Sequence, residues 1–414
     1  MMPPDIFTSS LAFTVSALIK TAFIWAPLLL SMIAWYSWKY YINRLHLSEI
    51  KWTMLEVRVP RDVFKSPMAM ELVLINALYQ TGGVGTWYHK HWLGNVPVYF
   101  SLEIVSIEGA VRFFIRTQPK FVSVIESAVY AHYPQAEVNE VEDYTLSVPP
   151  HGKDGSWSTF GTEFKLTKSD AVPIKTYVDY GLDKVGLLKD EQQIDPISST
   201  MELLGSMSEG EQFWIQIVVR PANWARYPDP KAEWHEWHKK IKWTDVGKAE
   251  IEKMLEKTKG KEGKPGVPLT KTEQDTLAAI EKSITKFGFD AGIRAIYIAK
   301  KEQFDASRIA ALTGIFRQYN TAELNGFAPC NVTSFDYPWQ DFSGNRTVEL
   351  KQGMLEAYRH RGFFYPPYDA GKNIFVLNTE ELATLYHFPG RVSETPTFAR
   401  IEAKKSEPPV NLPI

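Results

Sequence analysis

The first pattern along the chain is an uninterrupted apolar stretch near its N-terminus, "TAFIWAPLLLSMIAWYSW" at residues 21–38. It contains no charged residue, and the largely apolar "SLAFTVSALI" precedes it with only Lys20 between them. Since about 20 apolar residues of helix cross a bilayer, we expect one membrane-spanning helix here. The side chains of this anchor include Ala22, Phe23, Ile24, Trp25, Leu28, Leu29, Leu30, Ile33, Trp35 and Trp38.

The residues that flank the stretch are those typical of a membrane protein. An aromatic belt follows it: Trp35, Tyr36, Trp38, Tyr40 and Tyr41. The flanking charges are Lys39, Arg44 and Lys51 on its C-terminal side, against Asp5 and Lys20 on the other. The positive-inside rule then predicts a single-pass protein of the plasma (inner) membrane, with the bulk of the chain in the cytoplasm. A cleaved signal peptide is the alternative, and it is disfavoured because bulky aromatics, not small residues, follow the stretch.

From residue 54 to 141 the alternation of apolar and polar positions predicts six elements in the order β-α-β-β-α-β. "MLEVRVP" is typical of a strand, and "SPMAMELVLINALYQTG" of a helix with Ser66 as N-cap and Pro67 at its first position. The next run, "PVYFSLEIVSIEGAVRFFIRT", predicts a hairpin that turns at Glu108-Gly109. A helix, "PKFVSVIESAVYAHYP", and a strand, "QAEVNEVE", complete the unit. This order is that of the ferredoxin-like fold.

The same order recurs further along the chain. We expect strands at 172–180, 212–221, 291–300 and 326–335, and helices at 195–207 and 305–320. Between the two central strands, residues 222–288 predict a helical hairpin rich in lysine and glutamate, which is either decoration or an arm that contacts a partner. The predicted fold class is α+β: an N-terminal transmembrane helix followed by two ferredoxin-like repeats, the second with this insertion.

The patterns divide the chain into five parts. These are a membrane anchor with its flank (1–50), a first ferredoxin-like unit (51–150), a second with its insertion (151–340), a closing strand–helix element (341–390) and a flexible proline-rich tail (391–414). A hydrophobic fraction of 44% and a charged fraction of 23% are those of an ordinary globular protein. The single cysteine, Cys330, excludes an internal disulfide and a zinc site with several cysteines.

The motifs of common catalytic sites are missing from the sequence. It contains neither the P-loop pattern G-x-x-x-x-G-K-[ST] nor the nucleophile elbow G-x-S-x-G. His235 and His238 are three residues apart, whereas the two histidines of a zincin helix are four apart, and "HKH" at 89–91 lacks a third ligand. We therefore expect no enzyme, no cofactor and no metal ligand.

Nucleic acid remains an alternative partner, although the net charge of −2 does not favour it. RNA-recognition folds share the β-α-β-β-α-β order and stack bases on aromatic residues of one strand. In "AVRFFIRT", alternation places Arg112, Phe114 and Arg116 on one face of the strand, but the run matches the RNA-binding motif poorly.

Close to the C-terminus, "IFVLNTEELATLYHFPG" at 374–390 predicts a short strand that leads into a capped helical turn. Asn378 is the expected N-cap, and Glu381 completes a capping box with it. Leu382, Leu385 and Tyr386 share one face of the turn. These five residues either close the core of the second repeat or dock a partner.

Two stretches carry a resemblance to a known family. "LEIVSIEGAVRFFIRTQPKFVSVIESAVYAHYPQAEVNEVEDY" at 102–144 resembles the N-terminal, non-ATPase region of membrane-associated conjugative-transfer ATPases of the HerA/TraG type, which are related to type IV secretion motors. "FVLNTEELATLYHFPG" and the closing "RIEAKKSEPPVNLPI" resemble the junction that leads into the ATPase core of those proteins. The resemblance extends from residue 53 to the C-terminus.

The sequence departs from that family because it ends where the motor domain would begin. The resemblance therefore implies a membrane-anchored, non-enzymatic scaffold or docking subunit of a type IV secretion-like machine that translocates DNA or protein. The partners it implies are a separate motor ATPase of the HerA/TraG type, pore subunits, the lipid bilayer and further copies of the chain. Two alternatives stay open: a nucleic-acid-binding membrane protein, and a ligand-binding or enzymatic module that uses a cleft between the repeats.

Overall fold

The computed structural model describes residues 4–60, 65–80, 84–149, 155–184, 194–229, 239–258, 268–368 and 373–389, with side chains for residues 16, 17 and from 19 onward. The chain divides into two compact units. Unit 1 comprises Met1–Ile50, Gly82–Pro97 and Tyr365–Pro367, and unit 2 comprises Lys51–Thr81, Val98–Phe364 and Tyr368–Ile414. The histidines at 235 and 238 and the predicted tail, 391–414, lie outside the described residues.

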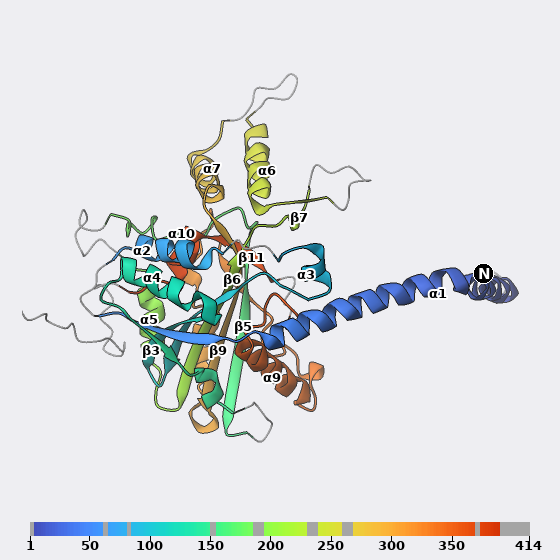
Figure 1. Cartoon of the computed structure of the whole chain (residues 1–414), viewed down its shortest axis with the longest axis horizontal. Coiled ribbons are helices and arrows are strands. Elements are labelled where there is room, and N and C mark those ends of the chain that lie inside the picture. The colour runs from blue at the N-terminus through green and yellow to red at the C-terminus, as the bar shows by residue number, and fades with distance from the viewer. Residues whose placement is uncertain are drawn as a thin grey trace, which may run out of the picture. The chain divides into compact units, whose positions relative to one another are not determined.

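Unit 1 is built on one long helix, α1, which spans Pro4–Glu49 and continues through Pro27 (Figure 1). The predicted apolar helix is thus confirmed, and it extends about ten residues past the apolar stretch. A short helix, α3 at Trp87–His91, belongs to the same unit.

Unit 2 contains one large sheet with helices packed on it (Figure 1). Its strands are β1 Thr53–Arg58, β2 Phe100–Ile107, β3 Ala110–Thr117, β4 Glu137–Val141, β5 Trp157–Leu166, β6 Glu211–Pro221, β9 Gly288–Lys300, β10 Phe327–Cys330 and β11 Phe375–Asn378. Its helices are α2 Pro67–Val73, α4 Val122–His132, α5 Ile197–Gly205, α6 Trp243–Glu256, α7 Lys271–Ile284, α8 Ser307–Thr313, α9 Asn345–Arg359 and α10 Thr379–Leu385. A separate hairpin pairs β7 Tyr227–Pro228 with β8 Lys240–Ile241.

The strand order of the sheet is β10-β5-β9-β6-β2-β3-β1-β4, and β11 also pairs with β9. The sheet has two halves: β1, β2, β3 and β4 form the first, and β5, β6, β9 and β10 form the second. In each half, the first strand in the sequence lies between the fourth and the third, and all these pairs are antiparallel. The two halves join where β2 pairs with β6, from Phe100 opposite Val219 to Ile107 opposite Gln212. The structure confirms a mixed α+β fold with a mostly antiparallel sheet.

Local signals in the first half are found where the sequence predicts them. The Ser66 hydroxyl accepts a hydrogen bond from the Met68 amide at 3.3 Å, and Pro67 opens α2. The β2–β3 hairpin turns at Glu108 and Gly109, whose φ angles are 53° and 84°. Positive φ at both central residues gives the twist that a two-residue hairpin needs.

One predicted strand of the second half is wrong. Residues 172–180 form turns and irregular backbone, and the first strand is instead β5, Trp157–Leu166. The amides of Ile174 and Tyr177 donate to the side chains of Glu381 and Thr384 at 2.8 and 3.0 Å. The segment alternates like a strand, but its backbone hydrogen bonds go to side chains of α10, to the Tyr319 carbonyl and to its own turns, and not to a strand of the sheet.

Both faces of the sheet are covered by helices. One hydrophobic cluster joins one face to α2, α4, α5, α8 and α10, and a second joins the opposite face to α9. Alternation along β3 separates the two: Phe113 belongs to the first cluster and Phe114 to the second. Because unit 2 holds both clusters, its core is complete without α1.

The insertion between β6 and β9 forms an arm of two helices, as predicted. α6 and α7 project from the sheet side by side (Figure 1). Trp243 and Gly247 of α6 and Ile280 and Ser283 of α7 are the buried residues of the two helices. The rest of the arm's described surface is open to solvent or a partner.

Candidate membrane anchor and docking element

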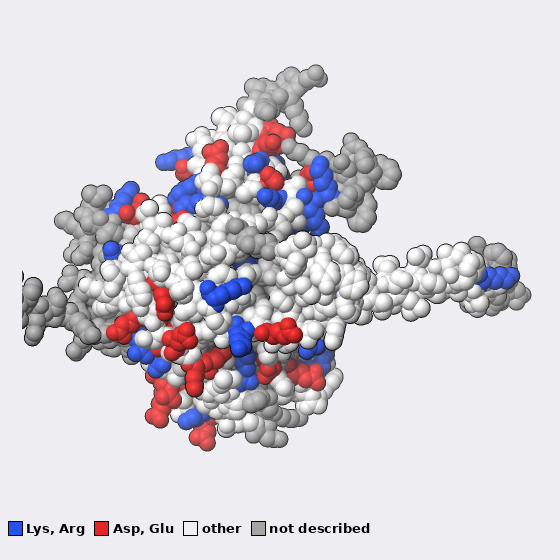
Figure 2. Space-filling model, in the orientation of Figure 1, with Lys and Arg blue, Asp and Glu red and all other residues white. Residues whose placement is uncertain are grey.

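The apolar part of α1 is exposed along its length. Residues Ile19–Glu49 are long and apolar enough to cross a membrane, and the most apolar 18 residues among them have a mean hydropathy of 1.4 and are 0% buried. Every predicted anchor side chain is exposed except that of Ala22, which is half-buried; Phe23 reaches 75%. Figure 2 shows the outer part of α1 without charged side chains, apart from lysine near its end. Such a continuous apolar surface is far larger than the patches that soluble monomers expose.

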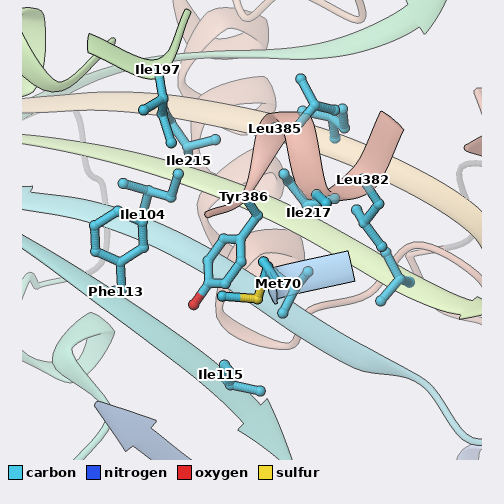
Figure 3. Close-up of a cluster of buried hydrophobic side chains, with 14 of the residues drawn as sticks. Met70, Ile104, Phe113, Ile115, Ile197, Ile215, Ile217, Leu382, Leu385 and Tyr386 are labelled. Carbon is cyan, nitrogen blue, oxygen red and sulfur yellow. The ribbon is translucent and has the colours of Figure 1, made fainter. Parts of the chain in front are cut away.

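The five predicted docking residues lie in the core of unit 2. Asn378, Glu381, Leu382, Leu385 and Tyr386 are between 0% and 3% exposed. Figure 3 shows the last three among side chains of β2, β3, β6, α2 and α5. Of the two alternatives for this face, core packing is what the structure shows, because side chains buried by their own chain present no surface to a partner.

The predicted capping box of α10 is confirmed. The Glu381 amide donates to Asn378 Oδ1 at 2.9 Å, and the Asn378 amide donates to Glu381 Oε2 at 2.8 Å. Burial raises the pKa of the Glu381 carboxyl to about 8. The backbone hydrogen bonds that it accepts oppose this shift but do not cancel it, because the side chain is screened from water on all sides.

A polar network beside α10 holds the base of the arm. Glu71 of α2 and Glu380 of α10 both pair with Lys286, at 2.7 and 2.8 Å, and Glu380 also pairs with Lys282 at 2.8 Å. Burial alone would lower the pKa of Lys286, but the two carboxylates raise it. Both lysines lie at the C-terminal end of α7. The network therefore connects the arm to α2 through Glu71 and to α10 through Glu380.

A cavity of about 230 Å³ opens next to this network, between α7, α10 and residues 173–179. Its polar lining includes Thr176, Asp179, Lys282, Lys286 and Glu380. Both lysines of the lining are already paired with carboxylates of Glu71 or Glu380, so neither is free to bind an anionic ligand.

A second cavity, of about 340 Å³, lies in the first half around Arg116. The Arg116 guanidinium lies 4.3 Å from the centre of the Trp52 ring, and its Nη1 atom is buried without a hydrogen-bond partner. Burial, together with the nearby charge of Arg361, lowers the pKa of Arg116 to about 10. Glu140 and Glu142 line the same cavity. This arrangement can bind a polar group that accepts one hydrogen bond from Arg116 and stacks on Trp52.

Other candidate chemistry finds little support in the described residues. No group of three or more His, Cys, Asp or Glu side chains there could hold a metal ion. Burial raises the pKa of the Cys330 thiol to about 11, so it stays protonated. Arg112 and Phe114 share a face of β3, as predicted. However, Arg112 Nε lies 3.9 Å from Glu56, which offsets its charge.

Sequence reasoning missed a buried ion-pair centre on the α9 face of the sheet. Arg361 pairs there with Glu103 at 2.8 Å and with Asp143. Glu103 is also bonded by Tyr144, whose hydroxyl lies 2.7 Å from it. The signal available in the sequence was a glutamate inside an otherwise apolar strand, "FSLEIVSI".

The comparisons with known proteins give a family but no activity. No curated protein matches the chain. The sequence model of one family, described as "Domain of unknown function (DUF8128)", matches residues 44–400, which include nearly all of unit 2 and the C-terminal end of α1. The chain therefore belongs to the DUF8128 family.

Proposed function

We propose that this chain is a membrane-anchored, non-enzymatic scaffold of a type IV secretion-like machine that translocates DNA or protein. In this proposal α1 crosses the plasma (inner) membrane once, unit 2 lies in the cytoplasm, and unit 2 seats a separate motor ATPase of the HerA/TraG type. Pore subunits and further copies of the chain complete the assembly.

The observation that carries the proposal is the exposed apolar surface of α1. Unit 2 has its own two-sided core, so α1 is not needed to complete it. A bilayer is the environment in which an exposed helix of this length and composition is stable. The two halves, with equal element order and equal strand order, support their interpretation as copies of one ferredoxin-like unit.

The arm of α6 and α7 is our candidate for the surface that contacts the ATPase. The face of α10 for which the sequence analysis considered partner docking is buried. The arm, in contrast, projects from the sheet (Figure 1). Lys282 and Lys286, at the base of the arm, form ion pairs with Glu380 of α10. A rigid, charged projection is suited to a specific contact, because little conformational entropy is lost on binding.

The proposal is tested in two experiments, one on membrane insertion and one on partner binding. After alkaline washing of membranes the full chain should remain in the pellet, whereas the Leu29→Arg variant should be released in part. Affinity capture from solubilised membranes should recover a hexameric ATPase or pore subunits. Glu256→Lys on α6 should reduce that recovery, and Glu202→Lys, a charge reversal at another exposed glutamate on α5, should not. A monodisperse monomer that recovers neither partner would refute the scaffold.

The cavity around Arg116 favours a second candidate function, a ligand-binding module. It lies within the first half, not between the repeats. Screening of small polar metabolites by thermal shift tests this: a ligand should raise the melting temperature of the wild type and not that of Arg116→Met. If no compound separates the two proteins, the cavity is structural.

A further inference from the structure

The segment that follows α2 packs against α1 inside unit 1. The Trp35 ring lies 6.3 Å from that of Trp87 and 5.6 Å from the imidazole of His91. Three residues further along α1, Trp38 donates from Nε1 to the His91 carbonyl at 3.0 Å, and its ring lies 5.5 Å from that of Trp92. α3 thus lies along α1 at the end of the apolar stretch.

A glycine permits this close approach. Gly94 has a φ of +68°, and a Cβ at this position would lie 2.3 Å from the carbonyl oxygen of Ile42. Between Trp35 and Ile42 the helix rises by about 10 Å, so the contact follows α1 for about two turns. This length is similar to the thickness of one headgroup layer, which is about 5–8 Å.

The outer side of α3 is apolar and uncovered. Trp87, Tyr88, Trp92 and Leu93 are 61%, 56%, 47% and 46% exposed. His89 does not share this side, because its Nδ1 lies 2.8 Å from the Thr86 hydroxyl at the start of the helix. The face of α3 that is turned to the viewer in Figure 2 shows no charged side chain, although the helix also carries the exposed Lys90.

We infer that α3 and the residues after it are a second membrane contact, in which Trp87, Tyr88, Trp92 and Leu93 lie in the headgroup region of the bilayer that α1 crosses. The inference rests on the proposed anchor. Tryptophan and tyrosine are enriched at this depth because one end of the ring is apolar and the other can hydrogen-bond. The aromatic belt on α1 is continuous with this surface through the ring contacts of Trp35 and Trp38.

The positive charges near the contact match the surface of an anionic membrane. Lys90 directly precedes His91, and Lys39 directly follows Trp38, which donates to the His91 carbonyl. Lysines close to the surface of an anionic leaflet are attracted to its lipids. With α1 and α3 both engaged, the membrane fixes the rotation of α1 about its own axis, which a single helix leaves free.

The experiment measures the depth of single labels on the full chain in phosphatidylcholine vesicles that contain phosphatidylglycerol. In a Cys330→Ala background, a fluorophore is attached to Tyr88→Cys, Leu29→Cys or Tyr337→Cys. Leu29 lies nine residues before Trp38, about 14 Å deeper and thus near the bilayer centre. Tyr337 of unit 2 is the matched control, since it is 52% exposed and also a tyrosine. Nitroxide lipids carry the quencher either near the headgroup or near the chain end.

The expected result is that the headgroup quencher acts most strongly on the label at 88, the chain-end quencher acts most strongly on that at 29, and the label at 337 is unaffected. If the label at 29 is quenched while that at 88 behaves like that at 337, the α3 contact is wrong and the anchor stands. Equal quenching at 88 and 337 also overturns it, because unit 2 then touches the membrane without specificity. If the label at 29 is not quenched, the anchor fails and the inference fails with it.

Discussion

Replacing Arg361 tests whether a buried ion-pair centre holds α9 and the segment after it on the sheet. Arg361 is fully buried. Its Nε and Nη2 atoms donate to Glu103 at 2.8 and 3.0 Å, Nη2 also donates to Asp143 at 3.1 Å, and Nη1 donates to the Arg359 carbonyl at 2.7 Å and to Asp143. All five N–H groups of the guanidinium therefore have a partner.

Arg361→Met keeps most of the side-chain volume but leaves the Glu103 carboxylate buried without its cation. Breaking such a pair by removing one partner costs about 3–5 kcal/mol. This is a large share of the roughly 5–15 kcal/mol by which a typical protein is stable. Urea unfolding of the full chain in detergent, followed by circular dichroism, should show a loss of about 4 kcal/mol at neutral pH.

The pH dependence of this loss gives a second measurement. Burial would raise the pKa values of Glu103 and Asp143, but the charge of Arg361 lowers them. Groups with a lowered pKa stabilise the fold above their unfolded pKa, and this stabilisation is lost as the pH falls through the folded value. In Arg361→Met the buried Glu103 carboxyl has lost its cation, so burial raises its pKa and the variant regains stability as this carboxyl is protonated. The difference between wild type and Arg361→Met should therefore shrink progressively as the pH falls from neutral into the acid range.

A double variant distinguishes the cost of the unpaired Glu103 carboxylate from the cost of lost packing around residue 361. Adding Glu103→Gln to Arg361→Met removes the unpaired carboxylate and should restore at least half of the lost free energy of unfolding. A loss below about 1 kcal/mol in the single variant would refute the reasoning. So would a double variant that is less stable than the single one.

Three further predictions concern α10 and α1. Leu382→Ala should lower the free energy of unfolding by about 2–5 kcal/mol, because the side chain is fully buried. Leu72 is partly exposed, so Leu72→Ala should change the free energy of unfolding by less than about 1 kcal/mol. Equal effects of the two substitutions would contradict the assignment of Leu382 to the core. Because burial raises the pKa of Glu381 to about 8, the wild type should lose stability as the pH rises towards that value, and Glu381→Gln should not; parallel pH profiles would rule this out. Gly94→Ala should speed hydrogen exchange in α3, because the added Cβ would meet a backbone oxygen of α1. Gly344 also has a positive φ, but a Cβ added there meets no atom, so Gly344→Ala should leave hydrogen exchange in α3 unchanged.

Local patterns along the chain were sufficient for much of the fold. The strands at 212–221 and 291–300 are found within β6 and β9, and the turn at Glu108-Gly109 is where the sequence placed it. The capping box of Asn378 and Glu381 was also predictable. These features depend on residues within a few positions of each other, whose conformational preferences act before any tertiary contact forms.

β5 was missed because buried polar side chains interrupt its apolar pattern, of which Phe160 and Phe164 are the core residues. Thr162 and Glu163 are buried in the strand, and Glu163 pairs with Arg294 of β9 at 2.6 Å. A buried charge is stable only with its partner, and that partner is 131 residues away. Nothing near β5 in the sequence reveals the pairing.

By itself, the sequence determined that this protein has one long apolar helix, two similar runs of strands and helices, and a capped closing turn, because each follows from the period of its own residues. Only the tertiary structure decided that the turn is core and not a docking surface, that Arg361 reaches Glu103 across 258 positions, and that α3 lies on α1. These outcomes depend on which distant surfaces meet. That choice is made by burial and charge pairing over the whole chain, which no local pattern encodes.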